Sequence, residues 1–443
     1  MRIFGKYRLT TFQIIAFGFI VLILIGTLLL SLPFASRNAG SAGFMDCLFT
    51  ATSAVCVTGL VVRDTASAWS PFGQAVILTL IQIGGMGVVT TAASLAFLSG
   101  RRIGLMQRSV MQESISAPQV GGIVRLTGFI LKTSAIIELT GAVLLAPVFC
   151  GDFGFWKGIW YSLWHSISAF CNAGFDLMGA REPFSSLCSY HDDIYLNCII
   201  MALIAVGGIG FLVWNDMKTQ KFQFKKYTLQ SKMVLLTSLL LILIPSVYFF
   251  LYEFHSLPMR DRAISSLFQS VTTRTAGFNT QDLSAMDESG TAVMILLMLI
   301  GGSPGSTAGG MKTVTFAVLF LSAITVFSRR NDVQCFKRRL PESAVRNAGA
   351  ILFMYLVLFL TSGMIISRVE NLPLLTCLFE TGSAIGTVGL TLGITGKLSL
   401  VSRVLLMILM FFGRVGGLTL IYAAVPSDES QYSRLPLEKI TVG

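Results

Sequence analysis

Long apolar runs are the feature of this sequence that most limits its possible folds. Five runs without a charged residue cover residues 9–35, 70–100, 194–215, 233–252 and 347–367, and three runs that include charges cover residues 123–149, 291–327 and 404–424. A helix needs ~20 apolar residues to cross a bilayer, so each run predicts one membrane span, eight in total. Only 12% of the residues are charged, against ~25% in soluble domains, so lipid is the expected solvent.

Basic residues are concentrated on one side of these spans. Lys and Arg outnumber Asp and Glu in the amino terminus and in the loops after spans two, four and six. Such a bias marks the cytoplasmic side, so we predict a multi-pass protein of a prokaryotic cell membrane with a cytoplasmic amino terminus. The net charge of +11 is explained by this topology, and nucleic-acid binding is not expected. The first span exceeds the ~7–15 apolar residues of a signal peptide, so it is expected to remain in the protein.

The eight cysteines show neither a CxxC pair nor a Cys/His metal-ligand spacing. His165, His191 and His255 are likewise not spaced as metal ligands. We predict no structural disulfide, and Cys150 with Cys188, both on the outer side, is the one pairing left open.

Four short segments between the spans resemble one another. Residues 55–60, 170–175, 273–278 and 385–390 each end in a small residue, a glycine and a large apolar residue. Each follows an apolar, hydroxyl-rich segment, at residues 45–54, 160–169, 263–272 and 374–384. These segments are too short to cross a bilayer and predict re-entrant helices.

The chain is therefore predicted to repeat one unit four times: span, short pore helix, glycine loop, span. Because each unit has two spans, all four repeats begin on the same side and share an axis along the membrane normal. The expected fold is an all-α membrane protein with a pseudo-fourfold, channel-like bundle. Its repeats occupy residues 9–100, 101–217, 218–328 and 329–425, followed by a polar tail at 426–443.

The glycine loops are the candidate functional site. Non-helical backbone at membrane depth is tolerated only in protein or beside a wet cavity, and glycine can turn its carbonyl toward an axis without steric cost. Rings of such oxygens replace the hydration shell of an ion. The predicted ion ligands are the main-chain oxygens of Val55, Cys56, Val57, Thr58 and Gly59; Phe170, Cys171, Asn172, Ala173 and Gly174; Thr273, Arg274, Thr275, Ala276 and Gly277; and Ile385, Gly386, Thr387, Val388 and Gly389. The carboxyl ends of four pore helices pointing at the centre favour a cation.

The sixth span is predicted to break, because proline and clustered glycines interrupt it. The segment reads Gly302, Ser303, Pro304, Gly305, Ser306, Thr307, Ala308, Gly309 and Gly310. It superficially resembles a phosphate-binding loop, but Met311 intervenes before Lys312 and the required Gly-Lys pair is absent. An ATP site is not expected there.

The whole chain resembles the Ktr/Trk/HKT superfamily of potassium transporters, and most closely its Ktr membrane subunits. The resemblance rests on residues 46–60, on 165–175, on 273–279, and on 379–380 with 386–390. The first glycine loop arrives by residue 59, without the two additional amino-terminal helices of Trk members. In contrast to tetrameric potassium channels, only the fourth loop reads Thr-Val-Gly, and no loop continues as Gly-Tyr-Gly.

The resemblance implies potassium as the transported ion, with sodium as an activator and no covalently bound cofactor. It also implies a homodimer in lipid, regulated by a cytoplasmic ring of nucleotide-binding subunits. Residues 302–310 then correspond to an intramembrane loop that closes the pore, and Arg414 is expected to lie against it. Lys312 could belong to the gate or extend to the interface.

Other interpretations were weighed against this one. A secondary carrier of a cation or solute, working by alternating access, is the main alternative. An enzyme is not expected, because no catalytic constellation is present. Glu138 is expected to pair with a neighbouring helix more than to form a second ion site. Asp46, Glu380 and Arg274 flank the loops, where a scaffold role through hydrogen bonds is favoured over the alternative of concentrating cations at the mouth.

Overall fold

The computed structural model describes residues 10–38, 40–88, 90–91, 104–115, 119, 121–221, 223–424 and 438. Within this part the chain is predominantly helical, as predicted. Two short strands, β1 (Gln334–Cys335) and β2 (Arg338–Arg339), form an antiparallel hairpin. The predicted polar tail, apart from residue 438, and residues 92–100 of the predicted second span lie outside the described residues.

Four long apolar helices open the four predicted repeats. They are α1 (Thr11–Leu30), α7 (Ile123–Phe153), α11 (Leu229–Tyr248, continued by a π-helical turn to Glu253) and α15 (Glu342–Glu370). Among the described residues, these four segments are long and apolar enough to cross a membrane as single helices. Much of their surface is apolar and exposed, as expected for helices whose outer face meets lipid.

A short helix follows each long helix and packs back against it. These short helices are α2 (Phe44–Val55), α8 (Phe155–Cys171), α12 (Met259–Thr272) and α16 (Leu374–Gly386). No charged residue lies in the last turn of any of these four helices, and every residue of that turn is buried. The carboxyl ends therefore lie in the interior of the molecule, where the glycine loops begin.

The helix that closes each repeat is interrupted. In the described residues α4 (Pro71–Met86) ends at Gly87, α9 (Ile194–Ile209) bends by 92° into α10 (Phe211–Gln220), and α17 (Leu400–Val415) bends by 95° into α18 (Gly417–Ala424). The third repeat has α13 (Glu288–Leu299) and α14 (Thr313–Phe327), with an irregular segment between them. The predicted break in the sixth span is present, and the segments predicted as spans over 194–215 and 404–424 are each bent at a glycine. Gly210 and Gly416 adopt φ of 104° and 91°, which a continuous helix cannot accommodate.

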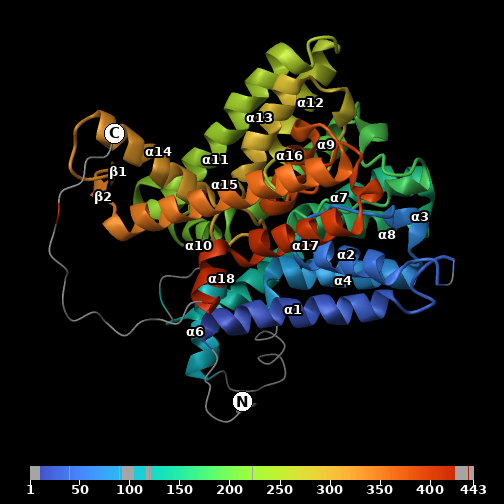
Figure 1. The fold of residues 1–443 in the computed structure, drawn as a ribbon, viewed down its shortest axis with the longest axis horizontal. Coiled ribbons are helices and arrows are strands. Elements are labelled where there is room, and N and C mark those ends of the chain that lie inside the picture. Colours follow the sequence, from blue (N-terminus) through green and yellow to red (C-terminus); the bar gives the residue numbers. More distant parts are fainter. Residues whose placement is uncertain are drawn as a thin grey trace.

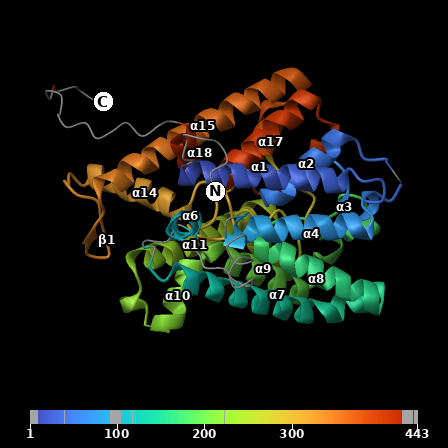
Figure 2. The ribbon, with the colours of Figure 1, turned by 90° about the horizontal axis from the view of Figure 1, so that it is seen from below.

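Two views show how the elements are arranged. α1 and α4 run side by side in Figure 1 and in the perpendicular view of Figure 2. In both views α14 and the β1–β2 hairpin project from one end of the molecule, the end that also holds α10 and α6 (Leu105–Ile115). The rings of Phe224 and Phe336 lie 6.3 Å apart, so the basic loops after α10 and α14 meet there. At the opposite end lies the short helix α3 (Thr65–Ala68).

The cysteines are all free, including Cys150 and Cys188. The pairing that the sequence left open is therefore not formed in this structure.

Candidate functional site

The carboxyl ends of the short helices close in nearly the same way. In three repeats the N–H one residue before the conserved glycine donates to a serine carbonyl five residues back, at 2.8 Å each: Thr58 to Ser53, Ala173 to Ser168 and Val388 to Ser383. The preceding residue in each case, Val57, Asn172 or Thr387, has φ between 50° and 58°. This pair of features is the Schellman ending of a helix, here built without glycine at the left-handed position.

The third repeat departs slightly from this pattern. Its left-handed residue is Thr275, with φ of 68°, and Ala276 N–H donates to Thr272 O at 2.9 Å. The position six residues before the conserved glycine is Val271 here and serine in the other three repeats. In the first and fourth repeats that serine hydroxyl accepts from the glycine N–H: Gly59 N to Ser53 Oγ at 3.1 Å and Gly389 N to Ser383 Oγ at 3.0 Å. The third loop is therefore supported differently from the other three.

The four glycines of the repeated segments form a closed ring. Gly59, Gly174, Gly277 and Gly389 all have positive φ, between 66° and 94°. A Cβ placed on each glycine would lie within 3.3 Å of the Cα of the next one: 3.2 Å from Gly59 to Gly174, 2.8 Å from Gly174 to Gly277, 3.3 Å from Gly277 to Gly389 and 3.0 Å from Gly389 to Gly59. The loops thus meet in chain order around one centre, and the contacts leave no space for a side chain at these four positions.

The side chains of the four loops are directed into protein. Of the twenty residues predicted to provide main-chain ligands, all are buried except Arg274, which is half-buried. The guanidinium of Arg274 donates to the Ser238 hydroxyl at 3.1 Å on α11. Its side chain therefore connects the third glycine loop to α11.

The segment between α13 and α14 folds back on itself directly beside these loops. Gly301 N donates to Met311 O at 2.7 Å and Thr313 N to Gly302 O at 3.0 Å, so its two ends are held together. Phe211 N donates to Gly305 O at 2.7 Å, which fixes the segment to α10. Gly310 N donates to Gly413 O on α17 at 3.1 Å. Residues 300–312, hereafter the intramembrane loop, are thereby attached to the closing helices of repeats two and four.

The intramembrane loop also contacts the glycine loops themselves. The Thr307 hydroxyl donates to Phe170 O, the first carbonyl of the second glycine loop, at 3.0 Å. A Cβ on Gly309 would lie 3.1 Å from Cγ2 of Thr387, and a Cβ on Gly310 would lie 2.9 Å from Gly386 O. Two of the four glycine loops are therefore in direct contact with this segment. Sequence analysis placed Thr307 in the predicted segment but did not predict its bond to Phe170, because the partner is a backbone carbonyl far away in the chain.

Arg414 connects the intramembrane loop with the first repeat. Its guanidinium donates to Gly85 O at 2.9 Å, and also to Gly84 O and to Thr307 O. Lys312 Nζ instead donates to Ala308 O at 2.7 Å, within the loop itself. Arg414 thus lies where the resemblance placed it, whereas Lys312 stabilises the loop internally.

The other charged candidates make structural contacts. Asp46 accepts from Arg63 at 2.6 Å and from Arg403 at 3.0 Å, and so joins the first and fourth repeats. Glu380 accepts from the Thr395 hydroxyl at 3.0 Å. Both carboxylate oxygens of Glu138 accept from the amide nitrogen Gln82 Nε2, at 2.9 and 3.1 Å. Each of these contacts joins a carboxylate to a neighbouring side chain, which is compatible with a scaffold role.

Comparisons with known proteins agree on one family. A model of the family described as TrkH, cation transport protein, matches residues 6–433. The potassium/sodium uptake protein NtpJ of Enterococcus hirae is 39% identical, covering 99% of this chain and 98% of the relative. Ktr system potassium uptake protein B of Bacillus subtilis is 37% identical, covering 96% and 95%. The crystal structure of the potassium transporter TrkH from Vibrio parahaemolyticus superposes with a TM-score of 0.75 at 20% identity, covering 96% of this chain and 87% of that one.

Proposed function

The chain belongs to the TrkH family of cation transport proteins, and from that premise we propose that it is the potassium-conducting membrane subunit of a potassium uptake system. Its relatives carry names of potassium or potassium/sodium uptake proteins. Membership of this family confirms the prediction of a transporter and not an enzyme.

The observation that carries the proposal is the closed ring of Gly59, Gly174, Gly277 and Gly389. Four backbone segments that meet without side chains between them leave main-chain oxygens as the groups available to an ion. We assign residues 55–59, 170–174, 273–277 and 385–389 to a selectivity filter for potassium. The buried side chains of these residues support this role, because they fix the backbone from outside.

The proposal includes an arrangement of eight spans. The four long helices provide the first span of each repeat, and the interrupted helices α4, α9–α10, α13–α14 and α17–α18 provide the second. The end with α6, α10 and the β1–β2 hairpin faces the cytoplasm in this arrangement, because its loops are basic. Lipid then surrounds the exposed apolar faces.

We assign the gate to the intramembrane loop and its partner Arg414. Contacts of Thr307, Gly309 and Gly310 with two glycine loops support this role, since movement of the segment would change the inner end of the filter. The relatives named as Ktr proteins are parts of a "Ktr system". By analogy, the chain works as a homodimer with a cytoplasmic nucleotide-binding regulatory subunit, and sodium acts as an activator.

Ion flux from the purified, reconstituted chain tests the proposal. Planar bilayers or liposomes would hold a potassium gradient, with sodium added to either side in a second series. Conduction through a filter predicts a reversal potential at the potassium equilibrium potential, with rubidium replacing potassium. A reversal potential displaced in fixed proportion to the sodium gradient would instead support the alternative function, a secondary carrier that couples the movement of potassium to that of sodium. Equal potassium and sodium currents would contradict the filter assignment.

A further inference from the structure

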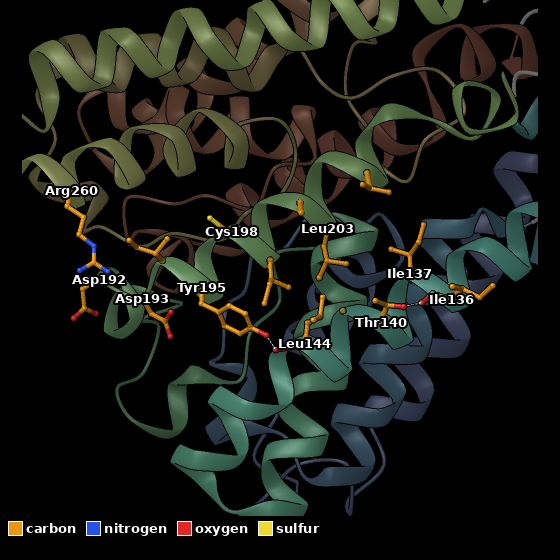
Figure 3. Close-up of a pocket in the computed structure, with 15 residues that line it drawn as sticks. Ile136, Ile137, Thr140, Leu144, Asp192, Asp193, Tyr195, Cys198, Leu203 and Arg260 are labelled. Carbon is orange, nitrogen blue, oxygen red and sulfur yellow. Dashed lines mark hydrogen bonds between the residues drawn. The ribbon is translucent and has the colours of Figure 1, made fainter. Parts of the chain in front are cut away.

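A groove between α7 and α9 opens on the outer surface of the helix bundle, away from the ring. It encloses about 850 Å³, within the ~300–1,000 Å³ typical of sites for small ligands. Its lining is almost entirely apolar along its length, with Ile136, Ile137, Leu203 and Val206 toward one end. Figure 3 shows this apolar end well separated from Arg260, Asp192 and Asp193 at the other.

The charged end of the groove lies at the outer end of α9. Asp193 caps α9, since its Oδ1 accepts from Leu196 N at 3.0 Å. Asp192 and Arg260 are exposed and form neither a hydrogen bond nor an ion pair with another residue of the described chain. Tyr195 stands beside them, its hydroxyl donating to Leu144 O at 2.9 Å. Tyrosine at such a position is typical of the membrane–water interface.

The length of the groove matches one leaflet of a bilayer. On α9 its lining runs from Ile194 to Val206, which corresponds to roughly 18 Å at 1.5 Å per residue. One leaflet has about 15 Å of hydrocarbon, half of the ~30 Å core. An occupant that follows the groove therefore has a polar head at the interface and an apolar chain that reaches the middle of the membrane.

We propose that this groove binds one phospholipid of the outer leaflet with a zwitterionic, primary-amine headgroup of the phosphatidylethanolamine class. The geometry provides one partner for each charge of that headgroup. In this arrangement the guanidinium of Arg260 donates hydrogen bonds to the phosphate oxygens of the headgroup. The carboxylate of Asp192 accepts hydrogen bonds from its ammonium group. An acyl chain fills the apolar length beside Cys198 and Leu203. An anionic headgroup without an amine leaves Asp192 without a partner and facing like charge.

Cys198 provides a native reporter of occupancy, because its side chain lines the groove and is exposed. In a full-length variant with Cys150, Cys188 and Cys335 changed to serine, every remaining cysteine other than Cys198 is buried. The variant is placed in nanodiscs of phosphatidylethanolamine or of phosphatidylglycerol, and modification of Cys198 by a membrane-soluble maleimide is timed. We expect modification to be about tenfold slower in phosphatidylethanolamine, since a hydrogen bond to a charged group is worth at least that factor.

Rim variants separate headgroup recognition from passive solvation by lipid. Asp192→Asn combined with Arg260→Gln is expected to abolish the difference between the two bilayers. Asp261→Asn, next to Arg260 in sequence but outside the groove lining, is the matched control and should keep it. Phospholipid that remains on the detergent-purified chain, measured by mass spectrometry, should be enriched in phosphatidylethanolamine for the control and not for the double variant.

Three results would overturn the proposal. Equal modification rates in both bilayers would remove headgroup recognition. An undiminished difference in the double variant would remove the assigned partners. Protection that increases with the number of chains per nanodisc, irrespective of lipid, would mean that a second copy of the chain covers the groove.

Discussion

Left-handed residues with branched side chains are the most constrained feature of the site. Val57, Thr275 and Thr387 adopt φ of 56°, 68° and 50°, at a cost of order 1–3 kcal/mol each. Their positions, two residues before the ring glycines, vary in type among the repeats, so the sequence carried no signal for them. The glycines themselves were predictable, because small-Gly-large recurs four times. The ring contacts explain that recurrence: no side chain fits.

Gly277→Ser is predicted to weaken the preference for potassium over sodium. Gly277 has φ of 82°, and a Cβ there would lie 2.5 Å from Val388 O, so the fourth loop must shift. We expect selectivity to fall by roughly tenfold, the equivalent of a 1–2 kcal/mol distortion. Reversal potentials under mixed potassium and sodium measure it.

Gly393→Ser is the matched control for this change. Gly393 also has positive φ, 84°, but a Cβ there meets no atom within 4 Å. It should retain selectivity. Equal selectivity in both variants would count against the filter assignment.

Asp176, in the loop between α8 and α9, predicts a pH dependence of stability. Burial raises the pKa of its carboxyl to about 7, the Met178 N–H opposes the rise and the Asp64 carboxylate adds to it. The folded chain binds this proton more tightly than the unfolded chain, so the contribution to stability is present below pH 4 and is lost as pH rises through 7. Asp176→Asn should therefore raise the melting temperature at pH 8 and leave it nearly unchanged at pH 4. Equal shifts at both pH values would contradict this assignment.

At the scale of elements, the closing helices differ most from the sequence prediction. Pro304 and the surrounding glycines predicted the break between α13 and α14 correctly. The bends at Gly210 and Gly416 were not predicted, because the glycines at 207–210 and 413–417 are equally compatible with close packing of unbroken helices. The bends follow from tertiary contacts: Phe211 N is held by Gly305 O, and Gly413 O is held by Gly310 N. Both partners belong to the intramembrane loop.

Deletion of residues 303–309 is predicted to raise ion flux and make it independent of regulatory subunits. The deletion removes the Thr307 bond to Phe170 O and the contacts of Gly309 with Thr387. Rubidium uptake into liposomes, with and without the regulatory partner, measures the effect. Thr307→Ser, which retains the hydroxyl, should behave as the parent. A deletion variant whose flux still required the partner would remove the gate assignment.

Arg414→Gln is predicted to shift the same equilibrium less strongly. The substitution loses the guanidinium contacts to Thr307 O, Gly84 O and Gly85 O, which together hold the intramembrane loop to α4. We expect raised basal flux with selectivity unchanged, since the ring is not touched. Arg414→Lys keeps the charge but not the forked geometry of the guanidinium, so its basal flux should lie between that of the parent and that of Arg414→Gln. Unchanged basal flux in Arg414→Gln would show that this bridge does not restrain the loop.

At the scale of the whole molecule, a fourfold organisation was predicted because the same unit recurs at similar intervals along the chain, and the described residues contain four long helices that are each followed by a short one. The contacts that join one repeat to another could not be predicted from the sequence. Asp46 joins Arg63 of its own repeat to Arg403 of the fourth, and no local pattern marks a partner so distant in sequence. Orientation in the membrane, inferred from basic loops, stays a prediction.

Labelling of single cysteines from one side tests that orientation. Cys150 lies at the end of α7 opposite the hairpin that holds Cys335. In right-side-out vesicles, a membrane-impermeant maleimide should modify a variant that retains Cys150 alone among the accessible cysteines. It should not modify a second variant that retains Cys335 instead. Inside-out vesicles should give the reverse. The same pattern in both preparations would contradict the predicted topology.

The ring has a consequence for biosynthesis. Gly59 is made early and Gly389 late, yet the two are neighbours, and between them the other loops follow in the order of translation. In the proposed filter, the wall of the pore is therefore completed one loop at a time in the order of synthesis, and the ring closes only when the fourth loop meets the first. A chain released before the fourth loop is made would have an open side and no complete coordination shell.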